Sequence, residues 1–302
     1  MIKCVGLSKR FGYVQALDEV SLHIAKGDVF GLVGPDGAGK TTFIRTVCGL
    51  ITPDKGTIWL AGAPPDRPGK TSQNLGYMPQ RFSLYGDLTV MENVIFFGSM
   101  YGLSKKTIIA RAEEILAITG MLDFKKRLAD QLSGGMKQKL ALTTALITRP
   151  EILILDEPTY GVDPESRHEF WKILYSLNQT GITILVSTPY MDEAELCSRV
   201  AFINAGQIKA VDSPAGLRQA FGHKLLELRI DSRDPHILNG VPGLLDVSFY
   251  GYKYLVVVDD IPTARSDIAF HLARLGISTL HISEAAPTME DVFVALAEGG
   301  TD

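Results

Sequence analysis

Short apolar runs that fit buried strands alternate with helical patterns along the first part of the chain. Residues 152–155 are all apolar and residues 182–186 are apolar except for Thr183, which is typical of parallel strands covered on both faces. The first strand that the pattern predicts is 20–24, followed by a strand at 28–33 and a helix at 41–50. Residues 107–120 carry apolar side chains at every third or fourth position, which predicts an amphipathic helix. The members of this stripe are Ile108, Ile109, Ala112, Ile115, Leu116 and Thr119.

The pattern changes near Gly222, where a second set of elements begins. Strands are predicted at 225–230, 247–250, 254–258 and 279–283, and helices at 234–241, 266–275 and 289–296. The order βαββαβ followed by a helix predicts a small ferredoxin-like α+β domain. We therefore expect an α/β domain over residues 1–220, with a helical insert at about 82–150 and a surface loop at 64–74. A small C-terminal α+β domain, accessory or regulatory, is expected over residues 223–302.

Composition and charge narrow the class of protein. The 302 residues carry 30 basic and 34 acidic side chains, a net charge of −4, with no long basic run, which argues against a nucleic-acid-binding surface. The three cysteines are scattered, which indicates reduced thiols in a cytoplasmic compartment. We see no secretory signal and no run of about 18 apolar residues, so we expect no membrane-spanning segment.

The stretch GPDGAGKT at Gly34–Thr41 fits the pattern G-x-x-x-x-G-K-[ST] between a predicted strand and a predicted helix. Glycines allow the backbone to point successive N–H groups at phosphate oxygens, and the helix N-terminus adds its dipole. Lys40 supplies a charge for the outer phosphates and Thr41 a hydroxyl for Mg²⁺. The alternative is an ordinary glycine-rich turn. The predicted nucleotide-binding residues here are Gly34, Pro35, Asp36, Gly37, Ala38, Gly39, Lys40, Thr41 and Thr42.

Two further stretches carry candidate chemistry. ILILDE ends a predicted buried strand with Asp156, which can hold Mg²⁺, and Glu157, which can polarise a water for attack on the γ-phosphate. By itself such an end is often only a polar turn. LSGGMKQKL places Ser133, Gly134 and Gly135 at a helix start, where free N–H groups favour an anion. The alternative there is a plain N-cap preceded by flexible glycines.

Taken in order, the P-loop, Gln80 in GYMPQ, LSGG and ILILDE resemble the ATP-binding-cassette (ABC) ATPases over residues 1 to about 215. The resemblance implies a P-loop NTPase cassette with a helical subdomain, and ATP and Mg²⁺ as cofactors. It also implies a second cassette that faces the first head to tail. In that arrangement Ser133, Gly134 and Gly135 contact the ATP held by the partner's P-loop.

The resemblance assigns roles at other positions one at a time. Phe11 in KRFG matches the aromatic residue that stacks on adenine, with a core aromatic as the alternative. Gln80 matches the residue that joins Mg²⁺ and the attacking water to the transmembrane partner, and Asp163 in GVDP matches a dimer contact. Tyr85–Asn93 matches the region that receives the coupling helix of a membrane subunit. The other interpretation is a plain loop and a helix start capped by Thr89, and both interpretations can hold together.

The residues within these motifs are similar to those of exporters with type-2 permeases, in particular the first cassette of two-cassette multidrug-type export ATPases. The sequence PTMEDVFVAL at 287–296 is similar to one that is common in the C-terminal domains of these exporters. The implied partners are ABC-2-type permease subunits and a second cassette, in a homodimer, a heterodimer or a tandem chain. The implied location is the cytoplasmic face of the inner membrane.

Other function classes fit less well. A soluble ABC protein acting on ribosomes or DNA is the alternative; its usual charged linker or long coiled coil is not evident here, and no nucleic-acid partner is expected. LSGG argues against a plain P-loop kinase.

Two positions depart from the family pattern. Pro189 stands where the family has a histidine that contacts the γ-phosphate, and Asp36 replaces the usual asparagine. In one interpretation the change is neutral because Glu157 suffices. In the other, which we favour because proline offers no side-chain donor, the ATP bound by this P-loop turns over slowly or not at all. A heterodimer or tandem chain with one degenerate and one active site would follow.

Overall fold

The computed structural model describes residues 1–64, 74–81 and 84–298. Most of the surface loop expected at 64–74, the start of the helical insert at 82–83, and residues 299–302 of the C-terminal domain lie outside this range. The chain divides into two compact units, Met1–Pro214 and Ala215–Asp302. In the part that is described, no helix is both long and apolar enough to cross a membrane.

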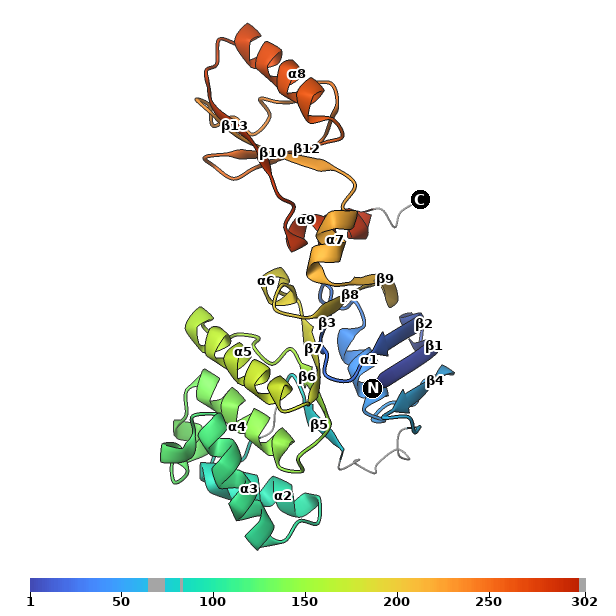
Figure 1. The fold of residues 1–302 in the computed structure, drawn as a ribbon, viewed down its shortest axis with the longest axis vertical. Helices are drawn as coiled ribbons and strands as arrows, with labels where there is room; N and C mark the ends of the chain where they lie inside the picture. The colour runs from blue at the N-terminus through green and yellow to red at the C-terminus, as the bar shows by residue number, and fades with distance from the viewer. Residues whose placement is uncertain (65–73, 82–83, 299–302) are drawn as a thin grey trace. The chain divides into compact units, whose positions relative to one another are not determined.

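A six-stranded sheet organises the first unit (Figure 1). Its first five strands pair in parallel and the last pairs antiparallel with its neighbour. In spatial order they are β5 (Leu75–Met78), β6 (Ile152–Asp156), β7 (Thr183–Thr188), β3 (Val29–Val33), β8 (Arg199–Asn204) and β9 (Gln207–Asp212). Val33 pairs with Thr188 and Asp156 with Ser187, so the carboxyl ends of β3, β7 and β6 meet at one edge. Ligands of open α/β sheets bind at that edge.

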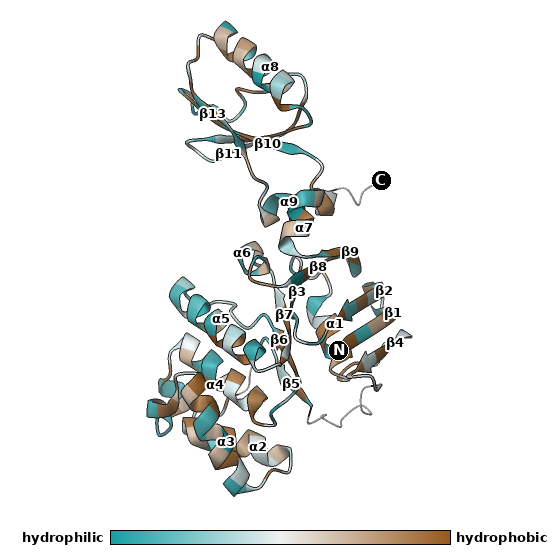
Figure 2. Cartoon of the chain, in the orientation of Figure 1, coloured by the Kyte–Doolittle hydropathy of each residue, from teal (hydrophilic) through white to brown (hydrophobic). Residues whose placement is uncertain are grey.

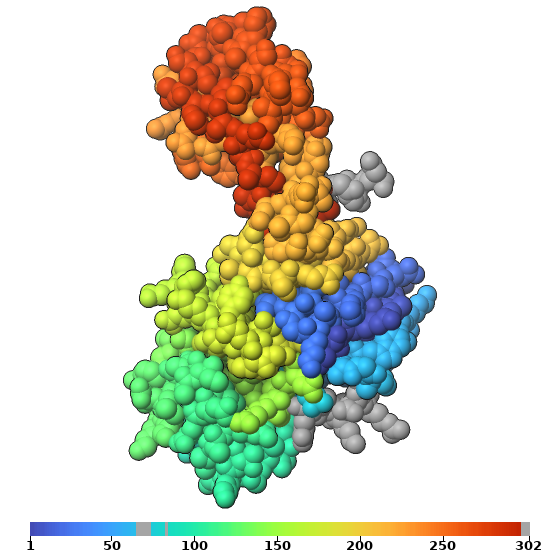
Figure 3. All heavy atoms as spheres, viewed as in Figure 1, coloured from blue at the N-terminus to red at the C-terminus, as the bar shows by residue number. Residues whose placement is uncertain are grey.

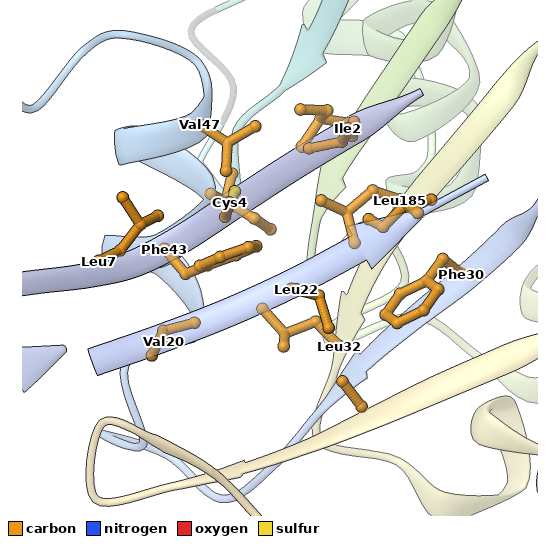
Figure 4. Close-up of a cluster of buried hydrophobic side chains, with 14 of the residues drawn as sticks. Ile2, Cys4, Leu7, Val20, Leu22, Phe30, Leu32, Phe43, Val47 and Leu185 are labelled. Carbon is orange, nitrogen blue, oxygen red and sulfur yellow. The ribbon is translucent and has the colours of Figure 1, made fainter. Parts of the chain in front are cut away.

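A second, antiparallel sheet lies over one face of the first sheet, and a single helix, α1 (Lys40–Val47), is packed between them. The strand order of this second sheet is β2 (Val14–Ile24), β1 (Ile2–Phe11) and β4 (Lys55–Leu60). Figure 4 shows side chains of both sheets around Phe43 and Val47 of α1. The sequence pattern predicted only the second half of β2 and missed β1, which supplies Ile2, Cys4 and Leu7 to this core.

Apart from α1, the helices of the first unit lie away from the antiparallel sheet; α2 to α5 are green to yellow-green in Figure 3, against the blue of the first strands. They are α2 (Val90–Met100), α3 (Lys105–Ile118), η1 (Leu122–Phe124), η2 (Ala129–Gln131), α4 (Gly134–Leu146), α5 (Pro164–Gln179) and α6 (Met191–Ala194). The predicted stripe on α3 is buried at Ile108, Ala112, Ile115 and Leu116, but Ile109 is 37% exposed. The prediction that Ile109 belongs to the buried stripe was wrong, because this residue lies at the border between the apolar face and the solvent-exposed face of the helix.

The second unit contains a four-stranded antiparallel sheet in the order β11, β12, β10, β13. The order agrees with the ferredoxin-like expectation. The predicted helix at 234–241 was wrong: the Asp234 carboxylate accepts the His236 N–H at 2.9 Å, and successive turns replace helical hydrogen bonds. The elements are α7 (Pro214–Ala220), β10 (Lys224–Ile230), β11 (Leu244–Phe249), β12 (Tyr254–Val258), α8 (Ile261–Arg274), β13 (Thr279–Ala285) and α9 (Met289–Glu298).

Candidate nucleotide site

The glycine-rich loop joins β3, whose five residues are all buried, to the N-terminus of α1. Gly37 and Gly39 have φ values of 78° and 108°, a region that favours glycine. A Cβ on Gly34 would lie 2.1 Å from the carbonyl oxygen of Ile203, and one on Gly39 would lie 2.5 Å from that of Ala16. The loop therefore needs glycine for its backbone angles and for its close packing against neighbouring backbone.

Lys40 begins α1 and is 4% exposed. Its Nζ donates hydrogen bonds to the carbonyl oxygens of Gly34 at 2.8 Å and Pro35 at 3.0 Å. It also forms an ion pair with Glu157 Oε1 at 3.1 Å, whereas the exposed carboxylate of Asp36 is 3.9 Å away. Phosphate oxygens bound in the loop would compete with Glu157 for this ammonium group.

Asp156 ends β6 and is fully buried. Its Oδ1 accepts hydrogen bonds from Ser187 Oγ at 2.7 Å and Thr41 Oγ1 at 3.2 Å. Its Oδ2 is buried without a hydrogen-bond partner. A buried carboxylate oxygen without a partner is costly, and a hard cation would satisfy it. Asp156 and Thr41 thus fit Mg²⁺.

The ligand set at this position is small. Among the described residues, no group of three or more His, Cys, Asp or Glu side chains could hold a metal ion. Mg²⁺ is commonly held by one or two protein oxygens together with phosphate oxygens and water. The residues present therefore suit a cation that arrives with a nucleotide better than an ion caged by protein alone.

Glu157 follows Asp156 with its backbone in the left-handed region, at φ 47°. Its N–H donates to Ser187 Oγ at 3.0 Å and to the Ser187 carbonyl oxygen at 3.2 Å, which holds this unusual conformation. Gln80 Nε2 donates to Glu157 Oε2 at 2.7 Å. The carboxylate, 6% exposed, thus lies between Lys40 and Gln80, where it could polarise a water beside a bound phosphate.

Ser187 was missed by sequence reasoning as a member of this group, although it contacts both carboxyl residues. Its signal was positional, since a serine at the carboxyl end of a parallel strand lies where ligands bind. Pro189, two residues further on, is half-buried. It offers neither an N–H nor a side-chain donor.

The LSGG segment forms the N-terminus of α4. Ser133 is exposed and accepts the Met136 N–H at 3.3 Å as the N-cap. A Cβ on Gly134 would meet open space, whereas one on Gly135 would lie 2.8 Å from Ser166 Oγ of α5. Within the described residues, no hydrogen bond or ion pair joins this segment to the group around Lys40.

Two other predicted residues also lie outside that hydrogen-bonded group. Phe11 ends β1 and is 48% exposed, with Lys9 Nζ 5.5 Å from the centre of its ring. Asp163 is the exposed N-cap of α5, and the Ser166 N–H that it accepts at 2.9 Å lowers its pKa. Their positions leave them accessible to a base or to another chain.

An apolar cleft of about 260 Å³ opens beside the segment that carries Gln80. The rings of Tyr85, Phe96 and Phe97 cluster next to it, with Tyr85 and Phe96 centroids 4.6 Å apart. Tyr85 is 45% exposed and Met100 70%. The cleft is lined by Tyr77, Met78, Pro79, Leu84, Phe97, Met100, Tyr101, Ala141, Thr144 and Ala145.

Known proteins are similar to this chain in sequence. A family model described as "ABC transporter" matches residues 17–160. Nod factor export ATP-binding protein I of Burkholderia orbicola is 40% identical over 303 residues, which cover 96% of this chain and 94% of that protein. The probable multidrug ABC transporter ATP-binding protein YbhF of Escherichia coli is 41% identical over 219 residues, 72% of this chain. The matched part is 38% of the YbhF length, so the chain spans well under half of that relative.

Solved structures agree on the fold. The dimeric structure of the ATP-binding cassette MJ0796 in a post-hydrolysis state, bound to ADP and Pi, superposes with a TM-score of 0.63 at 26% identity. It covers 70% of this chain and 98% of that one. The α/β P-loop cassette expected from the sequence is thereby confirmed. On its sequence and its fold, the chain belongs to the family of ABC transporter ATPases.

Proposed function

We propose that the chain is the ATP-binding motor subunit of a membrane exporter of the ABC-2 type, and that it binds and hydrolyses ATP between two cassettes. The observation that carries the nucleotide part is the convergence of five predicted residues at one sheet edge. Lys40, Thr41, Asp156, Glu157 and Gln80 come from three segments of the chain and are linked by hydrogen bonds or ion pairs between 2.7 and 3.2 Å.

Each residue has a defined role in this proposal. Loop N–H groups and Lys40 bind the β- and γ-phosphates, and Asp156 with Thr41 holds the Mg²⁺ that comes with ATP. Mg²⁺ neutralises the charge that develops on the phosphates. When a phosphate oxygen binds the Lys40 ammonium, Glu157 is released from its ion pair with Lys40. Glu157 then orients the attacking water together with Gln80.

The proposal includes a second cassette. Ser133 and Gly134 are exposed at the start of α4 and lie apart from the group around Lys40, which suits contact with ATP held by another P-loop. The related cassette MJ0796 has been solved as a dimer. Because Pro189 gives the γ-phosphate no side-chain donor, we propose a degenerate site on this chain, paired with an active one on a different cassette.

Export and membrane attachment rest on relatives and on the apolar cleft. The names of the relatives include export and multidrug transport, and the similarity to one of them extends over 96% of this chain. The cleft beside Gln80, with Tyr85 and Met100 exposed, suits an amphipathic helix from a permease at the cytoplasmic face of the membrane. An acidic net charge of −4 disfavours the alternative of a ribosome- or DNA-binding ABC protein.

Titration calorimetry with ATP, with and without Mg²⁺, tests the nucleotide site. We expect Lys40→Ala to weaken binding at least about tenfold, as for loss of a buried charge-assisted contact, and Asp156→Asn to abolish the Mg²⁺ effect selectively. Lys26→Ala, an exposed lysine outside the loop, is the control. ATP binding that is undetectable, or indifferent to Lys40, would contradict the proposal.

Cell fractionation in the native host separates the two partner classes. A tagged chain should sediment with membranes, and Met100→Glu in the cleft should release it, because a charge would have to be buried at the docking helix. Co-sedimentation with ribosomes in place of membranes would favour the alternative function.

A further inference from the structure

Glu193 is a buried carboxylate that the chemistry above does not use. It lies in α6 and is 1% exposed. Its Oε2 accepts a hydrogen bond from Thr188 Oγ1 at 2.6 Å, and its Oε1 accepts from Thr159 Oγ1 at 2.6 Å and Arg167 Nε at 3.2 Å. A buried carboxylate with three donors is held firmly, because losing one leaves charge without a partner.

The three donors belong to three segments around the nucleotide site. Thr188 ends β7 immediately before Pro189, and its hydroxyl also accepts the Tyr190 N–H at 3.1 Å. Thr159 lies two residues after Glu157, in the loop that leaves β6. Glu193 therefore fixes the loop that carries Glu157 against the segment that carries Pro189.

The third donor, Arg167, lies in α5, a helix that also contacts the LSGG segment. Ser166, next to Arg167, lies so close to Gly135 of LSGG that a Cβ there would come within 2.8 Å of its hydroxyl. Lys139 Nζ of α4 forms an ion pair with Glu169 Oε2 of α5 at 2.7 Å. Since α4 and α5 meet at both points, a displacement of the start of α5 displaces the LSGG segment as well. Figure 1 shows the two helices side by side.

We propose that Glu193 is a positioning residue that couples ATP at this chain's own P-loop to the placement of its LSGG segment. This rests on the proposed function, in which ATP draws Lys40 away from Glu157. The loop that follows Glu157 then moves Thr159, and Glu193 passes the displacement through Arg167 to α5. In a degenerate site, such coupling lets ATP that is bound but not hydrolysed set the geometry of the partner's site.

Amide hydrogen exchange on the full chain, with and without Mg²⁺ and the non-hydrolysable analogue AMP-PNP, tests the coupling without requiring turnover. In the wild type we expect saturating nucleotide to slow exchange in residues 34–41 and also in residues 133–139. In Glu193→Gln the change at 34–41 should persist. The change at 133–139 should fall at least about fivefold, the lower end of coupling factors between sites.

Asp192→Asn is the matched control. Asp192 pairs with the same Arg167 at 3.0 Å, but its side chain is 72% exposed, so its loss should leave both exchange changes as in the wild type. Thr159→Val, nearly isosteric, should reproduce the effect of Glu193→Gln and covers the case in which that variant fails to fold. Melting temperatures of all variants separate coupling from general destabilisation.

The outcomes distinguish the two proposals. If AMP-PNP does not change residues 34–41 of the wild type, the proposed function is wrong. If it protects them while residues 133–139 of the wild type do not respond, or respond equally in Glu193→Gln and Thr159→Val, the proposed function stands and the coupling role of Glu193 is refuted.

Discussion

Ser187→Ala removes a hydroxyl that contacts both carboxyl residues of the candidate nucleotide site. Ser187 is fully buried at the end of β7, donates to Asp156 Oδ1 at 2.7 Å and accepts the Glu157 N–H at 3.0 Å. Its carbonyl oxygen also accepts that N–H at 3.2 Å, so Glu157 keeps a partner in the variant. Asp156 would keep only the hydrogen bond from Thr41.

The expected cost follows from that difference. A hydrogen bond to a carboxylate contributes about 1.5–3 kcal/mol, so we expect the free energy of unfolding to fall by about 2 kcal/mol. With a urea m value of about 2 kcal/mol/M, the unfolding midpoint should fall by about 1 M. A displaced Asp156 should also weaken Mg²⁺-dependent ATP binding about tenfold, as for other residues that orient metal ligands.

Tryptophan fluorescence in urea measures this for the first unit alone. The two tryptophans of the chain, Trp59 and Trp171, both lie in that unit. Ser176→Ala is the control, because that exposed hydroxyl donates only to a carbonyl of its own helix and its loss should cost less than about 0.5 kcal/mol. A midpoint for Ser187→Ala that matches this control would refute the reasoning.

Three further predictions concern other parts of the chain. Phe11→Ala should weaken ATP binding by about 1–3 kcal/mol through lost base stacking, measured by calorimetry, whereas Phe11→Tyr should bind as the wild type does. Thr89→Ala removes the capping box of α2 and should cost about 1 kcal/mol in urea unfolding; an unchanged midpoint would contradict the cap's role. The Lys253 ammonium, and secondarily Arg229, lowers the pKa of Glu227 below its usual value of 4.5. The interaction of Glu227 with these two side chains therefore stabilises the second unit above pH 4.5, and this stabilisation is lost as the pH falls through the lowered pKa of Glu227. Glu227→Gln should reduce the acid sensitivity of β10 in hydrogen exchange corrected for intrinsic rates, and equal sensitivity would refute it.

The nucleotide loop and the central strands were predictable because their signals are local. GPDGAGKT combines backbone requirements at Gly34 and Gly39 with a strand before it and a helix after it, and few other structures satisfy that combination. The strands β6 and β7 are buried on both faces, and continuous apolar runs reveal such strands directly.

The missed features depend on contacts between distant segments. β1 was missed because Gly6 and irregular pairing with β2 interrupt its alternation of buried and exposed residues. Ser187 and Glu193 have no motif of their own; their importance comes from bringing β7 and α6 against the loop after β6. At 234–241 a local side-chain hydrogen bond of Asp234 outweighed the helical pattern.

Hydropathy indicates which face of a helix is buried, but it does not identify the residues that the rest of the helix contacts. Figure 2 shows α5 mostly hydrophilic, while Phe170, Trp171, Leu174 and Leu177 form its buried side. Periodicity fixes which residues are buried, but it does not say that the opposite end of the same helix contacts Gly135.

The steady-state ATPase rate of the purified chain tests the central claim most directly. It is compared with Glu157→Gln as the blank and with Pro189→His, which restores a side-chain donor at the family's histidine position. The account predicts that the wild type is close to the blank and that Pro189→His gains activity, up to about 100-fold for one recovered contact. A wild type that hydrolyses ATP well above the blank, with no gain from Pro189→His, would contradict the degenerate site and favour a symmetric homodimer.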